Sequence, residues 1–592
     1  MRTTIGQRNP YLITRALRTF MWASILAAVS NQLATTTDAV VVSNLIGTDA
    51  ISAINVVMPV LTLFTCLMIL FGIGASIVAA KAIGRCDEET ANGMFTSCLI
   101  SSGVTSVALA ILMFFFSPFI VEILTQGNED IYRYALPYLR SMSLFVPFLM
   151  LAGVLENFVK TDGNPRIVMI AVIVGSVLNL AFDIVFVKYC SLGIRGSAYA
   201  TGLNYIVALL ICCTHFRSPY NSLRWRLDRK RLFKYVGQSV SQGFAMSINT
   251  FLLAVSITAI NAIVLHAQGT EGLYCWSVCL QLFLIMQMAL SGISSSIYSI
   301  GGVLVGEQDM QGLSILNNRC LLYQCAAMAV VMLFIFSAPD MFGRLFGSVN
   351  GNGSEFLPAA LRIYSLMIIP YSVVALLRSN YQILGRYSLS LFLSVSQLLL
   401  MAAFVWGFSF ISPETLWWGF PLSSFCLFAG VLVFTGAVHR RNRNIRMLTL
   451  IPETDRVESL NISVKLERED IENATCTIAD FLRQQHIDAT TTYEVRLVCE
   501  ELMYNLLNYA VEKNPEKHFF DLHIRCHDGK VNILIKDDGR PFNPILKQDS
   551  GILFSLDDEH LGLKLVNRLG AAISYKYMYN QNMVQITFQT DK

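Results

Sequence analysis

Two carboxylates inside apolar segments are the first residues of this sequence whose type and position could do chemistry. Asp38 lies in the apolar run 20–42, and Asp183 lies in the run 167–188. An ionised, unpaired carboxylate at membrane depth costs ~2.5–3.5 kcal/mol even on a lenient scale, so each must be protonated, bind a cation or face water. Asn179 precedes Asp183 by four residues, so both side chains share one helical face and can reach one proton or ion. The alternative is a structural hydrogen-bonded pair between helices.

A second set of polar residues lies near the C-terminus. Glu501 and Asn505 are four residues apart on a predicted helix over 491–512 that is otherwise rich in Leu and Val, so a ligand or metal is needed to satisfy them. Asp537-Asp538-Gly539 follows a predicted strand, where a carboxylate can accept from a base amine and glycine lets the backbone approach. Gly562 lies at the start of another predicted helix, whose N–H groups can meet phosphates.

The two sets lie in parts of the chain with different compositions. The 592 residues are 54% hydrophobic and 14% charged, whereas a soluble domain carries about 25% charged residues. Residues 1–454 hold 28 basic and 19 acidic residues, a net charge of +9, while residues 455–592 hold 16 and 22, a net charge of −6. The first part is therefore predicted to be a membrane body and the second a water-soluble domain.

Apolar runs of about 18 residues or more predict helices that cross the membrane. We predict about twelve, at 20–42, 51–80, 95–117, 136–158, 167–188, 196–215, 237–265, 273–305, 318–338, 360–383, 387–410 and 416–438. The first run is long and eleven more follow it, so it is expected to stay in the mature protein rather than act as a signal peptide.

Basic residues in the connections predict the orientation. Four lie in 2–18, seven in 217–234 and four in 440–446, with six crossings between successive clusters, so all three lie on one side. Positive charge is retained in the cytoplasm, which places the N-terminus and the C-terminal domain there. A nucleic-acid or anionic-lipid patch is the alternative, but topology accounts for these charges without a partner, and no nucleic acid is expected.

The two halves of the membrane body repeat. Leu139-Arg140 recurs as Leu361-Arg362 at a shift of 222 residues, and the same shift relates Gly84 to Gly306 and Gly163 to Gly385. Six crossings preserve orientation, so the repeats are predicted to be parallel bundles that rock about a central cavity, as in transporters.

The fold predicted is therefore a polytopic α-helical membrane protein of two six-helix bundles followed by a soluble α/β sandwich. After about 455 we expect a strand at 462–467, helices at 470–484 and 491–512, a hairpin at 519–536, a helix at 560–569 and two strands within 572–589. The domains predicted are 1–215 for the first bundle, 216–236 for a basic cytoplasmic linker, 237–440 for the second bundle, 441–456 for a basic juxtamembrane linker and 457–592 for the soluble domain.

Over about residues 10–440 the sequence resembles the multidrug and toxic compound extrusion (MATE) transporters. The stretches that carry the resemblance are Thr37–Gly47, Gly72–Ser76, Gly84-Arg85, Thr161–Pro165, Leu178–Asp183 and Leu192–Thr201. The resemblance implies export of cationic or amphipathic compounds in exchange for H⁺ or Na⁺.

The resemblance also implies a coupling site in the first half. A first-helix Asp, a fifth-helix Asn and Asp, and a sixth-helix Thr bind the coupling cation in this family, and they match Asp38, Asn179, Asp183 and Thr201. Two carboxylates in one low-dielectric pocket repel each other, which favours a proton on one of them, and the same oxygens are hard ligands for Na⁺. The second half departs from the family and has few acids, so coupling is assigned to the first half alone.

The C-terminal part resembles the ATP-binding domain shared by gyrase, chaperone, histidine-kinase and mismatch-repair ATPases, and within it the anti-sigma-factor serine kinases. The resemblance implies that Glu501 is a general base, Asn505 a Mg²⁺ ligand, Asp537 the adenine contact with Gly539 beside it, and Gly562 part of the phosphate lid. His560 and Tyr509 depart from the family pattern, and a domain that has lost its nucleotide is the alternative.

Together these expectations describe a multi-pass plasma-membrane antiporter that uses H⁺ or Na⁺, exports small molecules and contacts membrane lipid. Its C-terminal domain is expected to bind ATP and Mg²⁺ and to regulate transport. The alternative is a membrane-anchored serine kinase or signalling regulator that uses a transporter-like body as its sensor and acts on a cytoplasmic protein.

Overall fold

The computed structural model describes residues 9–341, 356–453, 459–465, 467–505, 519–527, 529–541 and 572–589. The chain divides into two compact units. The membrane unit comprises residues 20–308 and 317–451, and the C-terminal unit comprises residues 1–19, 309–316 and 452–592. The two units are described separately.

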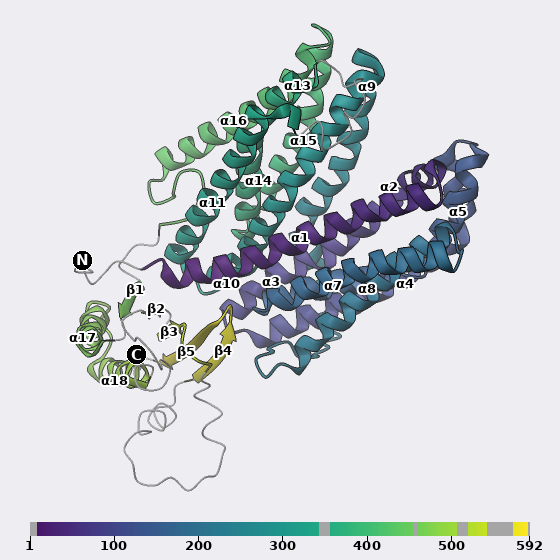
Figure 1. The fold of residues 1–592 in the computed structure, drawn as a ribbon. Helices are drawn as coiled ribbons and strands as arrows, with labels where there is room; N and C mark the ends of the chain where they lie inside the picture. Colours follow the sequence, from purple (N-terminus) through teal and green to yellow (C-terminus); the bar gives the residue numbers. More distant parts are fainter. Residues whose placement is uncertain are drawn as a thin grey trace. The chain divides into compact units, whose positions relative to one another are not determined.

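The first half of the membrane helices, purple to blue in Figure 1, leads from α1 to the end of η2. Its elements are α1 (Tyr11–Leu45), α2 (Thr48–Phe71), α3 (Ile73–Gly84), α4 (Glu88–Thr125), α5 (Glu129–Ser143), α6 (Val146–Thr161), α7 (Pro165–Asp183), the π-helix η1 (Ile184–Tyr189), α8 (Ile194–Cys213) and the 3₁₀ turn η2 (Thr214–Arg217).

The second half, teal to green in Figure 1, follows the linker that the sequence predicts at residues 216–236. Its elements are α9 (Leu232–Ser296), the π-helix η3 (Ile297–Gly301), α10 (Gly302–Gly306), α11 (Met310–Ser337), α13 (Leu357–Ser365), α14 (Ile368–Ile383), α15 (Tyr387–Ser409), the 3₁₀ turn η4 (Thr415–Trp418) and α16 (Gly419–Arg441).

By length and composition, ten helices within the described residues can cross a membrane, or eleven if α5 and α6 form one bent span. The prediction of about twelve differs mainly at Leu232–Gly306, which counts as one helix of 75 residues. Two predicted spans, 237–265 and 273–305, fall within it. Gly269 between them has φ 64° and ψ −151°, a conformation that interrupts the helix.

Other breaks divide single predicted spans. In the run 51–80, Gly72 interrupts the regular helix between α2 and α3, although Asp49–Gly84 still counts as one span, and the run 136–158 is bent by 54° between α5 and α6. Hydropathy does not register these breaks, because the residues on both sides remain apolar.

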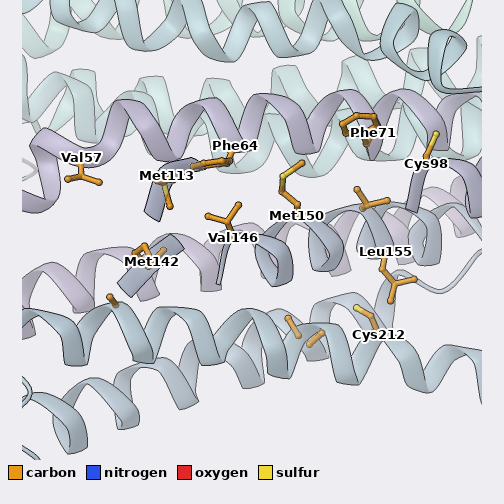
Figure 2. Close-up of a cluster of buried hydrophobic side chains, with 14 of the residues drawn as sticks. Val57, Phe64, Phe71, Cys98, Met113, Met142, Val146, Met150, Leu155 and Cys212 are labelled. Atoms are coloured by element: carbon orange, nitrogen blue, oxygen red, sulfur yellow. The ribbon is translucent and has the colours of Figure 1, made fainter. Parts of the chain in front are cut away.

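Each half has its own apolar core. Figure 2 shows the core of the first half, where Phe64, Met113, Met142 and Met150 are buried between helices α2, α4, α5 and α6. The core of the second half is built around Trp276, whose ring stacks on Phe420 at a centroid distance of 5.1 Å. Each of these two clusters lies within one half, which fits two bundles that can move as bodies.

The halves touch through glycines at the ends of α3 and α10. A Cβ placed on Gly84 would lie 2.1 Å from the Val303 carbonyl oxygen, and a Cβ placed on Gly306 would lie 2.2 Å from the Lys81 carbonyl oxygen. The two halves of this contact are related by the 222-residue shift found in the sequence. At this contact the backbone of the first half therefore packs directly against the backbone of the second half. The two halves contribute equivalent residues, so the contact has internal two-fold symmetry.

The linker between the halves is fastened by a buried acid. The Asp162 carboxylate lies 2.7 Å from His215 Nε2 and accepts a 3.1 Å hydrogen bond from the backbone N–H of Ser222. Asp162 and His215 are 3% and 2% exposed. The beginning of the linker is therefore held against the end of α6.

The C-terminal unit contains a five-stranded antiparallel sheet in the order β1-β2-β3-β5-β4. Its strands are β1 (Ser459–Lys465), β2 (Phe519–His527), β3 (Lys530–Asp537), β4 (Ala572–Met578) and β5 (Gln581–Gln589). The predicted hairpin is confirmed, since β2 pairs with β3 and His527 lies opposite Lys530. The predicted helix at 560–569 lies outside the described residues.

Two helices, α17 (Arg468–Gln484) and α18 (Ala489–Asn505), share an apolar core with this sheet. The sequence predicts that the second helix begins at residue 491, where Thr491 and Glu494 match a capping box, but this predicted start is wrong. The helix begins earlier, and Asp488 caps it by accepting a 2.7 Å hydrogen bond from the Thr491 backbone N–H. Asp488 provides the same kind of acceptor three residues upstream of Thr491.

Candidate functional site

Three helices hold the residues predicted to bind the coupling cation. Asp38 lies in α1, Asn179 and Asp183 lie in α7, and Thr201 lies in α8. Asp183 is the last residue of α7 before the π-helix η1. A π-helical turn inside an α-helix often marks a functional site, because it re-aims the adjacent side chains at the expense of regular hydrogen bonds.

The structure brings Asp38 next to the carboxyl group of Asp183. Asp38 is half-buried and interacts electrostatically with Asp183, and its Oδ1 accepts a 2.9 Å hydrogen bond from the Ser197 hydroxyl. Ser197 lies on α8, one turn before Thr201, and is fully buried. Sequence reasoning missed Ser197, because a serine inside a helix carries no signal of its own.

Asp183 is the most enclosed member of the group. It is 0% exposed, and apart from the carboxyl group of Asp38 no described group is close enough to donate a hydrogen bond to its oxygens. Among the described residues, the amide nitrogen of Asn179, one turn earlier, also lacks a partner although this residue is 3% exposed. Buried polar atoms without partners are costly, so this group of atoms is suited to a proton or a cation.

Thr201 is placed differently from the other three. It is half-buried on α8, and within the described residues no hydrogen bond joins it to Asp38, Asn179 or Asp183. Its part in the site therefore stays a prediction.

In the C-terminal unit, Asp537 closes strand β3 and is 2% exposed. Its Oδ1 accepts 2.8 Å hydrogen bonds from the backbone N–H of Gly539 and from the side-chain amide of Asn582. Its Oδ2 is buried and has no hydrogen-bond partner among the described residues. Burial raises the pKa of Asp537 to about 6, against the opposing effect of these two hydrogen bonds.

This arrangement fits an adenine contact. One carboxylate oxygen is held by the protein, and the other is left as an acceptor for an exocyclic amine. Asn582 was missed by the sequence reasoning, because its place opposite Asp537 depends on the pairing of β3 with β5.

The remaining predicted nucleotide residues are described only in part. Glu501 is half-buried on α18. Asn505 is the last described residue of α18, and its side chain lies outside the described part of the structure. Gly562 also lies outside the described residues. The roles of all three stay predictions.

The first turn of α1 belongs to the same unit and contacts this end of the sheet. Arg15 forms an ion pair with Asp538, and the Tyr11 hydroxyl donates to the same carboxylate at 3.3 Å. The Gln581 side-chain amide donates to the Leu12 carbonyl at 2.7 Å. Asp538 is the immediate neighbour of Asp537, so the predicted nucleotide edge and the start of α1 are adjacent.

Family models match both parts of the chain. Residues 23–185 match the MatE model, and residues 464–588 match the model described as histidine kinase-like ATPase domain. The chain therefore joins a MatE domain to a histidine kinase-like ATPase domain, which confirms the resemblance to MATE transporters and the resemblance to the ATP-binding domain, while the likeness to anti-sigma-factor serine kinases stays a prediction.

Similar proteins share the membrane part. "Probable multidrug resistance protein YoeA" of Bacillus subtilis is 24% identical over 335 residues, which are 55% of this chain and 72% of that protein. "Multidrug export protein MepA" of Staphylococcus haemolyticus is 24% identical over 250 residues, 42% of this chain and 54% of that protein. The chain thus spans about half the length of MepA.

Solved structures show the fold of the membrane part. A MOP superfamily transporter from Pyrococcus furiosus has a TM-score of 0.65 at 19% identity, and covers 72% of this chain and 95% of its own. A multidrug resistance MATE family transporter in an outward-facing conformation has the same TM-score and coverage. The membrane part therefore has the MATE fold.

Proposed function

We propose that this protein, a MatE domain joined to a histidine kinase-like ATPase domain, is a cation-coupled exporter of amphipathic or cationic compounds in the plasma membrane. The observation that carries the proposal is the pair of carboxyl groups on α1 and α7. Asp183 is fully buried with no described hydrogen-bond donor apart from the carboxyl group of Asp38, which is also its electrostatic partner.

The chemistry of the pair supports exchange of a cation for a substrate. Two ionised carboxylates in one enclosed site repel each other, and a bound H⁺ or Na⁺ removes that repulsion. Asn179 adds an amide oxygen beside Asp183, and Ser197 orients Asp38. Binding and release of the cation therefore change the charge of a site held by three helices, which can bias the packing of the first half.

The class of exported compound is supported by the similar proteins. YoeA and MepA are named as multidrug resistance and multidrug export proteins. The membrane part has the fold of MATE transporters, and its two apolar cores suit bodies that rock against each other.

The test is flux in proteoliposomes with imposed H⁺ and Na⁺ gradients and a fluorescent cationic dye. Asp38→Asn is expected to abolish cation-driven efflux, because the amide cannot ionise. Asp49→Asn, at an exposed acid in the first turn of α2, is the matched control and is expected to keep efflux. Full cation-driven efflux from Asp38→Asn would contradict the proposal.

The C-terminal domain is proposed to bind ATP with Mg²⁺ and to regulate transport. Asp537 fits the adenine amine through its free Oδ2, and the described residues around it are consistent with the matched domain. Bound ATP would supply a transferable phosphoryl group, while this chain's own residues recognise the base and orient Asp537 through Asn582 and Gly539.

The start of α1 supports a regulatory role. Tyr11 and Arg15 contact Asp538, next to the proposed adenine carboxylate, and the same helix carries Asp38. The C-terminal unit therefore includes the first residues of the helix whose later part carries Asp38.

Regulation is tested by flux with and without Mg-ATP on the domain's side of the bilayer. The full chain is expected to respond to ATP, whereas Asp537→Asn and a chain ending at residue 454 are expected not to respond. ATP binding with no change in flux would contradict the regulatory role, and phosphate transfer to a cytoplasmic protein under those conditions would favour the signalling alternative.

A further inference from the structure

Arg378 is a buried cation in the second half of the membrane unit. It lies on α14, five residues before the helix ends, and is 6% exposed. A charged side chain in such a helix is costly and usually marks a functional position. The sequence reasoning did not single it out.

Few described groups compensate the positive charge of the Arg378 guanidinium. Within the described part of the chain, its Nε has no hydrogen-bond partner, and its Nη1 has one long contact of 3.5 Å with the neutral amide oxygen of Gln397. No ion pair joins it to an acid within the described residues. A guanidinium carries five N–H donors, so most of its capacity is available to a ligand.

The side chains that interact with Arg378 include the uncharged polar groups of Gln397 and Tyr298. Gln397 is fixed by donating from its amide nitrogen to the Tyr371 carbonyl at 3.0 Å, so its oxygen faces the guanidinium. Tyr298 also interacts electrostatically with Arg378, and its hydroxyl lies 3.0 Å from that of Ser379. These groups form a polar site with an excess positive charge.

The equivalent position in the first half has the opposite charge. Helices α6 and α14 each contain 16 residues and are related by the 222-residue shift, which places Glu156 opposite Arg378 in the repeat. Glu156 interacts electrostatically with Lys160, one turn further on. The residue that corresponds to Lys160 is Gln382, so the second half has no matching counter-charge on its own helix.

The site borders the contact between the two halves. Ser299, next to Tyr298, has its hydroxyl 3.4 Å from that of Thr161 at the end of α6. Rocking of the halves would separate this contact and give a ligand access to the polar site.

We propose that Arg378, with Gln397 and Tyr298, binds the carboxylate of an exported compound. The inference rests on the proposed export function and adds carboxylate-bearing amphipathic molecules to its substrates. A planar carboxylate can accept two hydrogen bonds from a guanidinium, which supplies the missing counter-charge. Snorkelling to the membrane surface is a poorer account, because a snorkelling guanidinium would be exposed and this side chain is buried.

Binding to the purified full-length protein is measured by calorimetry, with 2-naphthoate and its uncharged amide, 2-naphthamide, as probes. Wild type is expected to prefer the carboxylate. Arg378→Gln is expected to weaken 2-naphthoate binding at least about tenfold with little change for 2-naphthamide, and Arg378→Lys is expected to lie between, because it keeps the charge and loses the planar fork. Arg362→Gln, an exposed arginine of the same half, is the matched control and should bind both probes normally.

Gln397→Glu provides a second variant that does not remove the buried arginine. It places a carboxylate of the protein beside Nη1, so it is expected to fold well and to exclude 2-naphthoate. Equal binding of both probes to wild type, or unchanged 2-naphthoate binding to both Arg378→Gln and Gln397→Glu, would overturn the inference. Displacement of 2-naphthoate by phosphatidylglycerol but not by phosphatidylcholine would assign the site to a lipid headgroup and would overturn it as well.

Failure of this inference is distinguishable from failure of the proposed function. Probe binding is measured without a gradient and does not depend on Asp38. If cation-driven efflux is normal but the wild-type protein shows no preference for the carboxylate probe, only the proposed Arg378 site is ruled out. Carboxylate preference without any efflux keeps the Arg378 site and removes the export function.

Discussion

At the scale of single residues, Ser197 connects α8 to the carboxyl group on α1. Its hydroxyl donates to Asp38 at 2.9 Å, and a hydrogen bond to a charged group contributes about 1.5–3 kcal/mol. The hydroxyl favours the ionised acid, so its removal has opposite effects on the two candidate cations. A proton would be held more tightly, whereas Na⁺ would lose an oriented ligand.

Ser197→Ala is therefore expected to raise the apparent H⁺ affinity of transport or to lower the apparent Na⁺ affinity, by roughly tenfold in either case. The measurement is efflux rate against cation concentration in proteoliposomes. Ser106→Ala is the control, because the Ser106 hydroxyl bonds only to the Gly103 carbonyl of its own helix. An unchanged affinity for both cations would remove Ser197 from the site.

Asp537 makes nucleotide binding dependent on pH. Its pKa is raised to about 6, and only the ionised carboxylate accepts from an amine with both oxygens. Adenosine affinity of the protein is therefore expected to fall roughly tenfold between pH 7 and pH 5, as measured by calorimetry with this phosphate-free probe. Asp537→Asn should remove most of the pH dependence.

The stability of the domain depends on pH with the opposite sign to adenosine binding. Because the folded pKa lies above that of the unfolded chain, this group stabilises the domain fully below about pH 4, and that contribution is lost as the pH rises through about 6. If adenosine binds more weakly at pH 5 because the domain unfolds at that pH, a group other than Asp537 controls the pH dependence of binding.

Asp38, Asn179 and Asp183 could be identified from the sequence alone, because charged and amide side chains are rare in apolar runs at membrane depth. Ser197 and Asn582 could not be found in this way. Their importance comes from which strand or helix lies opposite them, and spacing along the chain does not contain that information.

At the scale of elements, close packing around Thr201 depends on its neighbour Gly202. A Cβ added at Gly202 would lie 2.1 Å from the ring of Phe145, which precedes α6. Gly202→Ala is expected to destabilise the protein by about 1–3 kcal/mol and to reduce cation-driven efflux, because α8 must shift to accommodate the methyl group.

The measurement is thermal unfolding of the purified protein together with flux. Gly430→Ala is the matched control, because nothing lies within 4 Å of a Cβ at this position of α16. There the same substitution is expected to be neutral or to stabilise by about 0.5–1 kcal/mol. Equal effects at the two glycines would contradict the packing argument.

Hydropathy located the apolar segments well, but it did not predict how they are divided. The break at Gly72 and the interruption at Gly269 both lie inside or between apolar runs, and only backbone geometry reveals them. The helix cap at Asp488 was missed for a related reason, because Thr491 and Glu494 satisfy the same sequence pattern.

At the scale of the whole membrane unit, Gly84 and Gly306 set how closely the halves approach. Each would bring a Cβ within 2.2 Å or less of a carbonyl oxygen of the other half. Gly84→Val is therefore expected to disfavour the state described here, in which α3 and α10 touch, and to slow transport because that state must form in every cycle.

Hydrogen exchange followed by mass spectrometry measures this directly. Faster exchange is expected in Ile73–Gly84 and Gly302–Gly306 of Gly84→Val. Gly103→Ala is the control, because its nearest neighbour would be 3.6 Å from the new Cβ, an ordinary contact. Unchanged exchange and transport in Gly84→Val would show that the contact is not part of the cycle.

The two-fold character of that contact also bears on how each half can lose it. Lys81, Gly84 and their counterparts Val303 and Gly306 make the same pair of approaches in both directions, as two identical subunits do across a symmetric dimer interface. A protein with the length of one half of the membrane part would need only one glycine to meet its own copy. In a single chain that contains both halves, each glycine is a separate requirement, so either half can lose the contact by a mutation of its own.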